Sequence, residues 1–460
     1  MNPRQTLDSI LLMAGLGPST RDVAIEGDDP VLPTRFLLGT AASAAIAATG
    51  VAASDLWYER TGERQRVSID TRRAAAALRM DRYLRIDGAP PPTPWGDISG
   101  LYEARDGRWV QLHCNFPHHR DGTAALLGCA PERAQVKEAV AKWDGFALTE
   151  ALSEAGMCAA LVRERTEWEA LPQAQAVAKL PLFEIIRIGD AGRERLPEGE
   201  RPLSGVRVLD LTRVLAGPVA GRDLASHGAD VLRVTSDNLP GFPDSVDIDT
   251  GHGKRSANLD LTTNNGRAIL EALASESDIF LQSYRPGALD AYGFSPERLA
   301  ELRPGIIYVT LSAYGHEGPW ASRRGFDSLV QSASGIVFEQ SAGATPPRHM
   351  PAQALDYVTG YLLAFGAIVA LRRRAREGGS YLVRCSLAQT GRWLWNLGRT
   401  DFDPAALPNL DPDGVADLLM TSESKKGLLT HLAPVLQMSE TPPRWERASS
   451  PLGSDEPIWL

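Results

Sequence analysis

Residues 204–234 read SGVRVLDLTRVLAGPVAGRDLASHGADVLRV, and this stretch decides the fold. Val206–Thr212 is a short run rich in Val and Leu, which predicts a buried strand, and Asp230–Val234 predicts a second one. Pro218–His227 lies between them and has the length and composition of a helix. Short apolar strands that alternate with helices are typical of a parallel sheet whose two faces are both covered. The stretch therefore predicts a βαβ unit.

The alternation of helices and strands continues beyond this unit. We expect helices at 266–275 and 296–302, and strands at 279–283 and 306–312. The fold class is therefore α/β, with a Rossmann-like parallel sheet in a large domain at 201–400. The turn LTRVLAGP after the first strand lacks the GxGxxG dinucleotide fingerprint.

Two loops at the strand ends carry basic residues. Arg213 lies in the first turn, and Lys254 and Arg255 precede the strand in GHGKRSANLDL. A plain connection and a solvated basic pair are the simplest interpretations of each loop alone. Two such loops on one parallel sheet favour a phosphate-bearing ligand, because ligands bind beyond the carboxyl ends of the strands in open α/β sheets.

The chain before residue 201 has a different pattern. LYEARDGRWVQLHC, which starts at Leu101, alternates around an Asp-Gly turn and predicts a hairpin. Helical stretches follow, and then a strand and a linker rich in Pro, Gly and charge indicate a domain boundary near Arg201. The last stretch is rich in Pro, Asp and Ser and is expected to be an irregular arm. We predict an N-terminal segment (1–34), a degenerate helix-strand repeat (35–97), a small α/β domain with linker (98–200), the large domain (201–400) and a C-terminal arm (401–460).

Two segments repeat the same order of elements. Residues 40–72 and 356–388 each read as an Ala-rich helix, a basic helix end, a Gly turn and a β-branched strand, and the second begins 316 residues after the first. At this offset Gly62 aligns with Gly378, and Val67 aligns with Val383. Coincidence between two Ala-rich helices could produce part of the match, but the shared order favours a duplication.

Composition excludes several classes of protein. There are 48 Lys+Arg against 57 Asp+Glu, a net charge of −9, which argues against non-specific binding of nucleic acid or anionic membranes. The apolar share of 43% is that of a soluble globular protein. Residues 36–53 are long enough to cross a membrane, but their Ala, Gly, Ser and Thr favour a buried helix. The four scattered cysteines and the absence of a recognisable secretory signal predict a reduced, cytoplasmic protein.

Several catalytic signatures are missing. His113, Cys114, His118 and His119 form HCxxxHH, a spacing that fits no usual zinc site, so strand-face and surface histidines are expected and no metal is predicted. GxSxG, Walker A and HExxH do not occur.

Asp356 opens the apolar helix in QALDYVTGYLLAFGAIVAL. An Asp at this place is most often a cap, worth about 1 kcal/mol. The first repeat has Thr40 here, which would cap almost as well. A carboxylate in an apolar setting can instead act as a covalent nucleophile. Both roles remain open from the residues alone.

Residues 204–400 closely resemble the large domain of family III CoA-transferases. The motifs that carry the resemblance occur in family order and are SGVRVLDLTRVLAGP, GADVLRV, GKRSANLDL, QSYRPGALDAYGFSPERLAELRPGIIYVTLSAYGHEGP and RRGFDSLVQSASG. Residues 35–190, with ERTGERQRVSID and DGRWVQL, resemble the helix and small domain of the family, and APVLQMSETPPRWERASSPLG resembles its C-terminal end. The helix and small domain come first here, so the resemblance implies a family fold whose segments are duplicated, trimmed and rearranged.

The resemblance implies a site and a reaction. Asp356 matches the catalytic aspartate, and Glu317 matches a glutamate near the reacting centre of formyl-CoA transferase. The positions matching CoA contacts are Arg213, Val214, Leu215 and Ala216 in the first turn, Lys254 on the phosphate side, and Gln282, Ser283 and Tyr284 at the next strand end. The implied substrates are an acyl-CoA and a carboxylic acid, handled without a metal or redox cofactor. Family members form interlocked dimers, so a homodimer is expected, with neither nucleic acid nor membrane as partner.

Two alternatives remain beside CoA transfer. Related racemases of 2-methylacyl-CoA pair the aspartate with a histidine in a GHD motif, but this chain reads Gly325-Phe326-Asp327. Phe cannot exchange a proton, which favours transfer over two-base racemisation. The rearranged order also leaves open a non-catalytic CoA-binding subunit, although the intact Asp356 argues against it.

Overall fold

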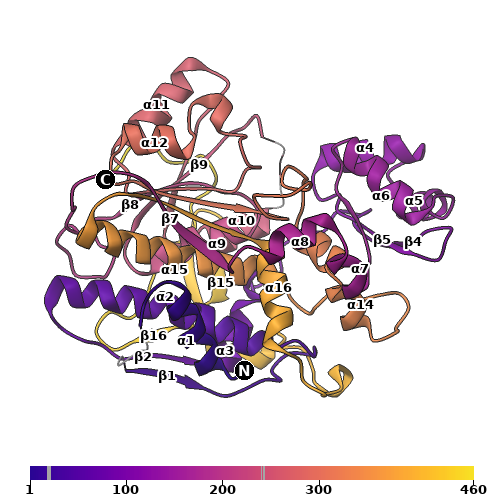
Figure 1. The fold of residues 1–460 in the computed structure, drawn as a ribbon, viewed down its shortest axis with the longest axis horizontal. Helices are drawn as coiled ribbons and strands as arrows, with labels where there is room; N and C mark the ends of the chain where they lie inside the picture. The colour runs from indigo at the N-terminus through magenta and orange to yellow at the C-terminus, as the bar shows by residue number, and fades with distance from the viewer. Residues whose placement is uncertain (18–21, 240, 242–243) are drawn as a thin grey trace.

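A parallel sheet forms the centre of the computed structural model, which describes residues 1–17, 22–239, 241 and 244–460 (Figure 1). In the described residues this sheet has seven strands in the order β10-β9-β8-β11-β12-β13-β7. The first six run parallel, and β7 pairs antiparallel with β13 at the edge. The predicted Rossmann-like α/β fold is therefore confirmed. The strands are β7 (Phe183–Gly189), β8 (Arg207–Leu211), β9 (Asp230–Thr235), β10 (Lys254–Asn258), β11 (Ile279–Gln282), β12 (Ile307–Ser312) and β13 (Ser380–Ser386).

The order of these strands defines a switch point. The chain moves from β8 outward to β9 and β10, then returns to place β11 on the other side of β8. At such a point the two loops that leave the neighbouring strands diverge, and a crevice opens beyond the carboxyl ends. The predicted site residues 213–216 and 282–284 follow β8 and end β11, so they lie at this switch point.

Helices cover both faces of the sheet. Val208 points into one apolar core, with residues of α2 (Leu38–Thr61), α9 (Ala216–Ser226) and α15 (Ala354–Glu377). Leu209, the next residue, points into the other core, with residues of α11 (Asn264–Ser275) and α12 (Pro296–Leu302). Both faces are thus buried, which explains why the strands read as continuous apolar runs. Figure 1 shows α11 and α12 on the opposite side of the sheet from α2 and α15.

The predicted duplication is visible in the helices. α2 and α15 each have 24 residues and end at a glycine with positive φ, Gly62 and Gly378. β2 (Val67–Asp70) leads to α3 (Thr71–Ala77), which Asp70 caps, and β13 leads to α16 (Leu387–Leu397), which Ser386 caps. α15 begins 316 residues after α2, and α16 begins 316 residues after α3. The two long helices pack against each other, so the copies form one core.

α15 is also the one helix of the described residues that is long and apolar enough to cross a membrane. Its apolar window is wholly buried inside the protein. α2, which contains most of the Ala-rich stretch, is buried from Leu38 through Ala53 as expected.

A small lobe stands beside the sheet (Figure 1). It consists of β4 (Gly100–Glu103), β5 (Trp109–Leu112) and β6 (Ala159–Leu161) with α4 (Pro117–Leu127), α5 (Arg133–Val140) and α6 (Gly145–Glu154), around a core of its own. β4 and β5 form the predicted hairpin. The next elements are α7 (Arg165–Glu169), α8 (Pro172–Ala178) and β7, and they connect the lobe to the large domain. Gln173 of α8 donates to the carbonyls of Tyr314 and Glu317 in that domain. The chain thus joins the large domain before the boundary expected near Arg201.

The C-terminal arm is not irregular as expected. β14 (Leu419–Ser424) and β15 (Gly427–Leu432) form a hairpin that adds β3 (Arg85–Ile86), and β16 (Gln437–Met438) pairs with β2, which also pairs with β1 (Val23–Glu26). β15 and β16 pair with strands from the first 90 residues, so local composition did not reveal this pairing. The remaining helices are α1 (Pro3–Met13), α10 (Asp244–Thr250), α13 (Asp327–Ala333) and α14 (Ile336–Ser341), with 3₁₀ turns at Met80–Arg82, Asp290–Tyr292, Pro404–Ala406 and Asp413–Leu418.

Candidate active site

The start of α15 is capped by a residue from outside the helix. Asp327, the first residue of α13, accepts hydrogen bonds through Oδ2 from the N–H of Leu355 at 2.8 Å and of Asp356 at 3.1 Å. α2 begins in the same way, since Asp29 accepts from the N–H of Gly39 and of Thr40. Helix capping is therefore not the role of the Asp356 side chain, which leaves this carboxyl group available for chemistry.

Asp356 lines a small pocket of about 50 Å³. Both halves of the chain contribute to its wall. Three of the site residues predicted from the sequence line it, namely Val214, Leu215 and Asp356. The described lining residues are Asp81, Pro94, Trp95, His113, Asn115, Val214, Leu215, Val246, Phe326, Asp327, Ser328, Gln353 and Asp356. The pocket thus joins the switch point of the sheet, the start of α15 and the segment that leads into the small lobe.

Burial and a neighbouring charge change the acidity of Asp356. Burial raises the pKa of its carboxyl group well above the ordinary value, and the nearby Asp327 raises it further. Burial also raises the pKa of Asp327, but the two N–H groups and the Gln331 amide, which all donate to this carboxylate, lower it. Hydrogen bonds of this kind favour the ionised form of the acceptor. The hydrogen bonds thus favour the ionised form of Asp327, whereas burial and the charge of Asp327 favour the neutral form of Asp356.

The turn between β8 and α9 is held in a tight shape. Val214 has a φ of +69°, in the left-handed region that β-branched residues rarely adopt. The N–H of Arg213 donates to Ser283 Oγ at 3.1 Å, which ties the two strand ends of the switch point together. α9 begins at Ala216, so the N–H groups of its first turn have no acceptor inside the helix. The turn thus presents a helix N-terminus beside the pocket.

Three arginines form what we call the basic rim, Arg213, Arg285 and Arg324. Arg213 lies over the ring of Phe116 at 5.4 Å, and the Phe116 ring is 6.0 Å from that of Phe326, which lines the pocket. Burial lowers the pKa of His118, and the charges of Arg324 and Arg213 lower it further. Arg285 and Arg324 both lower the pKa of Cys158, which burial raises.

Two arginines of the basic rim, Arg285 and Arg324, carry positive charge that no described carboxylate balances. In the described part of the chain, no ion pair joins Arg285 or Arg324 to a carboxylate, and Arg324 instead lies 3.3 Å from His119 Nε2. The sequence analysis missed Arg285 and Arg324. Their positions just after β11 and just before α13 were the available signal, since residues beyond strand ends gather at one edge of a parallel sheet.

Lys254 is buried beneath α9. Its ammonium group donates to Asp210 Oδ2 at 2.8 Å and to the carbonyl of Pro218 at 2.7 Å. Burial lowers its pKa to about 8, against the raising effect of Asp210. The ammonium group stabilises the β8–α9 connection from below, so the expected role on the CoA phosphates stays a prediction that this position does not favour.

Glu317 lies outside the pocket. Its side chain is 59% exposed and its carboxylate is 3.6 Å from Arg384. Gln282 donates to Thr310 Oγ1 at 2.6 Å and accepts from the N–H of Tyr284 at 2.7 Å, so it shapes the end of β11. Ala216 follows β8, and Tyr284 follows β11. Burial raises the pKa of Tyr284.

The pocket also contains residues that the sequence analysis did not assign to it. His113, expected on a strand face or the surface, is 5% exposed, and its ring stacks on Phe326 with centroids 3.8 Å apart. Asp81 accepts a hydrogen bond from the hydroxyl of Tyr357 at 2.7 Å, next to Asp356 in α15. Local patterns could not place these residues here, because the contacts span hundreds of positions. In the described residues, no group of three His, Cys, Asp or Glu side chains is suited to a metal ion.

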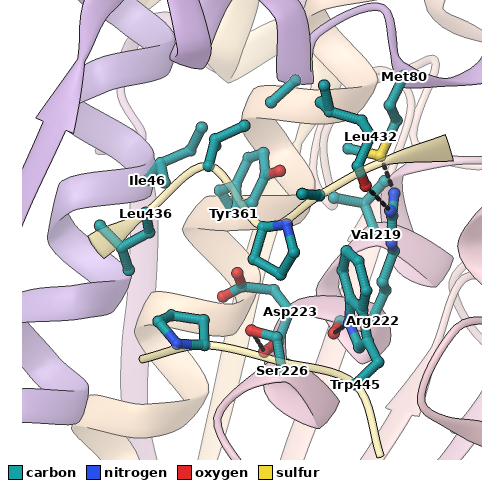
Figure 2. Close-up of a pocket in the computed structure, with 15 residues that line it drawn as sticks. Ile46, Met80, Val219, Arg222, Asp223, Ser226, Tyr361, Leu432, Leu436 and Trp445 are labelled. Atoms are coloured by element: carbon teal, nitrogen blue, oxygen red, sulfur yellow. Dashed lines mark hydrogen bonds between the residues drawn. The ribbon is translucent and has the colours of Figure 1, made fainter. Parts of the chain in front are cut away.

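A second crevice, of about 30 Å³, lies beside α9 and does not include Asp356. Figure 2 shows Arg222 extending toward Met80 and Leu432, with Trp445 beside it. Arg222 pairs with Asp249 at 3.2 Å, and the Trp445 indole donates to the carbonyl of Arg222. These contacts attach the C-terminal arm to the large domain, so the crevice is a packing junction in this structure.

Known proteins identify the domain that holds this site. Residues 203–401 match the model of CoA-transferase family III. This part of the chain is similar to that family. The match begins just before β8 and ends after α16, so the matched region contains the switch point, the basic rim and Asp356.

Relatives of this chain are named as CoA-transferases. The acetyl-coenzyme A transferase of Hypoxylon pulicicidum is 28% identical over 445 residues, which cover 83% of this chain and 74% of the relative. The matched 83% of this chain is more than residues 201–460 alone contain, so the match extends into the first half. The two halves therefore occur in the same order in this relative. A probable fatty acyl-CoA transferase of Mycobacterium tuberculosis is 34% identical over 44% of this chain and 56% of the relative.

A crystal structure of a hypothetical protein from Mycobacterium tuberculosis is 32% identical, with a TM-score of 0.40, over 43% of this chain and 59% of that chain.

Proposed function

We propose that the protein is a CoA-transferase that moves CoA from an acyl-CoA to a carboxylic acid, with Asp356 as the covalent nucleophile. One observation carries the proposal. In a region that matches the model of CoA-transferase family III, Asp327 caps α15 and so leaves the Asp356 carboxyl group to line a pocket beside the basic rim. A carboxylate in a desolvated pocket is a competent nucleophile, because water no longer stabilises its charge.

In the first half of the reaction the donor acid leaves. The Asp356 carboxylate attacks the thioester carbonyl carbon, the C–S bond breaks, and a mixed anhydride and CoA thiolate form. The thiolate then attacks the Asp356 carbonyl carbon, the anhydride C–O bond breaks, and the donor acid departs as its carboxylate. CoA is now bound as a thioester of Asp356.

The second half repeats these steps with the acceptor acid. Its carboxylate attacks the Asp356 thioester and releases CoA thiolate, which leaves a new mixed anhydride. The thiolate attacks the acyl carbonyl of the acceptor, gives the new acyl-CoA and restores the Asp356 carboxylate. Protons and electrons balance without a redox partner.

The surrounding residues support these steps. The basic rim is suited to the phosphates of CoA, since guanidinium groups bind phosphate in bidentate geometry. The N–H groups of Leu355 and Asp356 are occupied by Asp327, so they are not the oxyanion donors that a helix start would otherwise supply. The first turn of α9, beside Val214 and Leu215, is the helix N-terminus that can stabilise developing negative charge.

Racemisation is the weaker alternative. His113 stacks on Phe326 and could supply the missing base from another segment. Burial lowers the pKa of His113 to about 3, with smaller effects from His119 and His349. A base with so low a pKa is poorly matched to removing an α-proton near neutral pH, which favours transfer.

The test replaces the nucleophile. Asp356→Asn should lower transfer at least about 1,000-fold, because the amide cannot form the anhydride, while CoA binding at the basic rim is retained. Hydroxylamine trapping after incubation with acyl-CoA, read by mass spectrometry, should locate the adduct at Asp356 in the unmodified protein. Asp121→Asn, an exposed carboxylate on α4, is the matched control and should keep full activity. Turnover retained in Asp356→Asn would exclude the mechanism.

A further inference from the structure

The chemistry of the pocket wall restricts the acyl group. The side chains of Pro94, Trp95, Val214, Leu215, Val246 and Phe326 make most of the wall apolar. Within the described lining residues there is neither Lys nor Arg, whereas Asp81, Asp327 and Asp356 contribute three carboxyl groups. A carboxylate at the far end of an acyl chain would enter this pocket without a cation and close to like charge, which is costly in a desolvated site.

Two residues that line the same pocket each have a buried polar atom without a hydrogen-bond partner. These atoms are Nε2 of His113 and Oε1 of Gln353. Buried polar atoms are nearly always paired, so an unpaired atom that lines a cavity indicates a partner that the ligand supplies. His113 is held in place by its stack on Phe326 and by Ser328 Oγ, 3.4 Å from its Nδ1.

The two unpaired atoms have complementary roles. The direction of the hydrogen bond between Ser328 Oγ and Nδ1 of His113 follows the His113 tautomer. We assign the tautomer in which Ser328 donates to Nδ1, so that Nε2 of the neutral imidazole carries the proton and is a donor. The Gln353 amide oxygen is an acceptor. A hydroxyl group accepts one hydrogen bond and donates another, so one hydroxyl can satisfy both atoms, whereas a ketone or a plain alkyl chain cannot.

We propose that the acyl group handled by this site is an uncharged hydroxyacyl group, whose hydroxyl pairs with His113 and Gln353. This inference rests on the proposed CoA transfer, and it names the substrate class of the same pocket. The donor and the acceptor acid both become attached to Asp356, so the preference applies to each acid in turn.

The experiment compares three thioesters of the same chain length in the full-length protein. They are butyryl-CoA, 3-hydroxybutyryl-CoA and succinyl-CoA, each with acetate as the acceptor. We expect kcat/KM for 3-hydroxybutyryl-CoA to exceed that for butyryl-CoA about tenfold, as for one or two hydrogen bonds to buried groups. We expect succinyl-CoA to be at least about 100-fold poorer than 3-hydroxybutyryl-CoA, because its terminal carboxylate is left unpaired.

Variants of the two polar residues separate their role from general packing. His113→Phe keeps the ring that stacks on Phe326 and removes Nε2, and Gln353→Met keeps the length of the chain and removes the amide. Each should abolish the preference for 3-hydroxybutyryl-CoA over butyryl-CoA, mainly by raising KM for 3-hydroxybutyryl-CoA. Gln353→Glu supplies an acceptor and should keep more of the preference than Gln353→Met.

Different failures have different meanings. Transfer that is equally fast or faster with succinyl-CoA would overturn the uncharged substrate class. A hydroxyl preference that survives in both His113→Phe and Gln353→Met would overturn the assignment of the two residues. A protein that transfers from none of the three thioesters and gives no Asp356 adduct with any acyl-CoA would refute the proposed function itself.

Discussion

At the scale of single residues, the main feature is a division of work between two carboxyl groups. Asp327 is surrounded by donors and fixes the start of α15, whereas Asp356 is desolvated and lines the pocket. The sequence analysis singled out Asp356 as a candidate catalytic residue and predicted its place at a helix start. The cap was not, because Asp327 lies 29 positions earlier and belongs to another helix.

The two carboxyl groups should make transfer depend on pH. Burial first, and then the charge of Asp327, raise the pKa of Asp356, so the nucleophile becomes ionised only as pH rises and kcat/KM should rise with it. Asp327→Asn keeps an oxygen that accepts from the N–H groups but removes the charge, so it should move the rise to lower pH. A pH–rate profile of both proteins measures this shift. An unchanged profile in Asp327→Asn, with activity retained, would contradict the coupling.

At the scale of elements, the site depends on a close approach between α15 and α9. A Cβ at Gly360 would lie 2.5 Å from the carbonyl oxygen of Ala216 and 2.9 Å from Val219 Cβ. Gly360 lies one turn after Asp356, and Ala216 begins the helix beside the pocket. The spacing of these helices therefore sets the distance between the nucleophile and the turn that follows β8.

Gly360→Ala should force these helices apart. We expect a loss of about 1–3 kcal/mol in the free energy of unfolding, as for overpacked cores, and a fall in transfer that is larger than the fall in CoA binding. Gly391→Ala in α16 is the control, because its Cβ would find the nearest atom at 3.6 Å, an ordinary contact. That substitution should be neutral or stabilising through helix propensity. Denaturant unfolding and steady-state kinetics report the two effects, and equal stabilities for the two variants would refute the packing argument.

At the scale of the whole molecule, one chain surrounds the pocket. Asp81, Trp95 and His113 come from the first half, and Val214, Phe326 and Asp356 come from the second. The duplicated helices α2 and α15 hold the halves together in one core. The homodimer expected from the resemblance stays a prediction.

Activity should therefore be a property of the single chain. We expect the specific activity to stay constant, within about twofold, when the protein is diluted from micromolar to low nanomolar concentration, even if a dimer forms at high concentration. Stopped assays together with sedimentation or mass photometry over the same range test this. A loss of specific activity that follows dissociation would show that a second copy completes the site.

The sequence by itself determined the parallel sheet, its helices, the duplication and the position of Asp356. Apart from the duplication, which appears when two distant segments are compared, these features are local, because apolar periodicity, turn residues and a short motif each act within one element or between adjacent ones. The strands after Val206 and the helix start at Asp356 were therefore found from the residues alone.

Only the tertiary structure decided what surrounds Asp356. It placed His113 and Trp95 in the pocket, committed Lys254 to Asp210, left Glu317 outside, and paired the C-terminal hairpin with the strand at 85–86. Each of these facts is a contact between residues far apart in the chain, whose free energy depends on burial and geometry that no local pattern encodes.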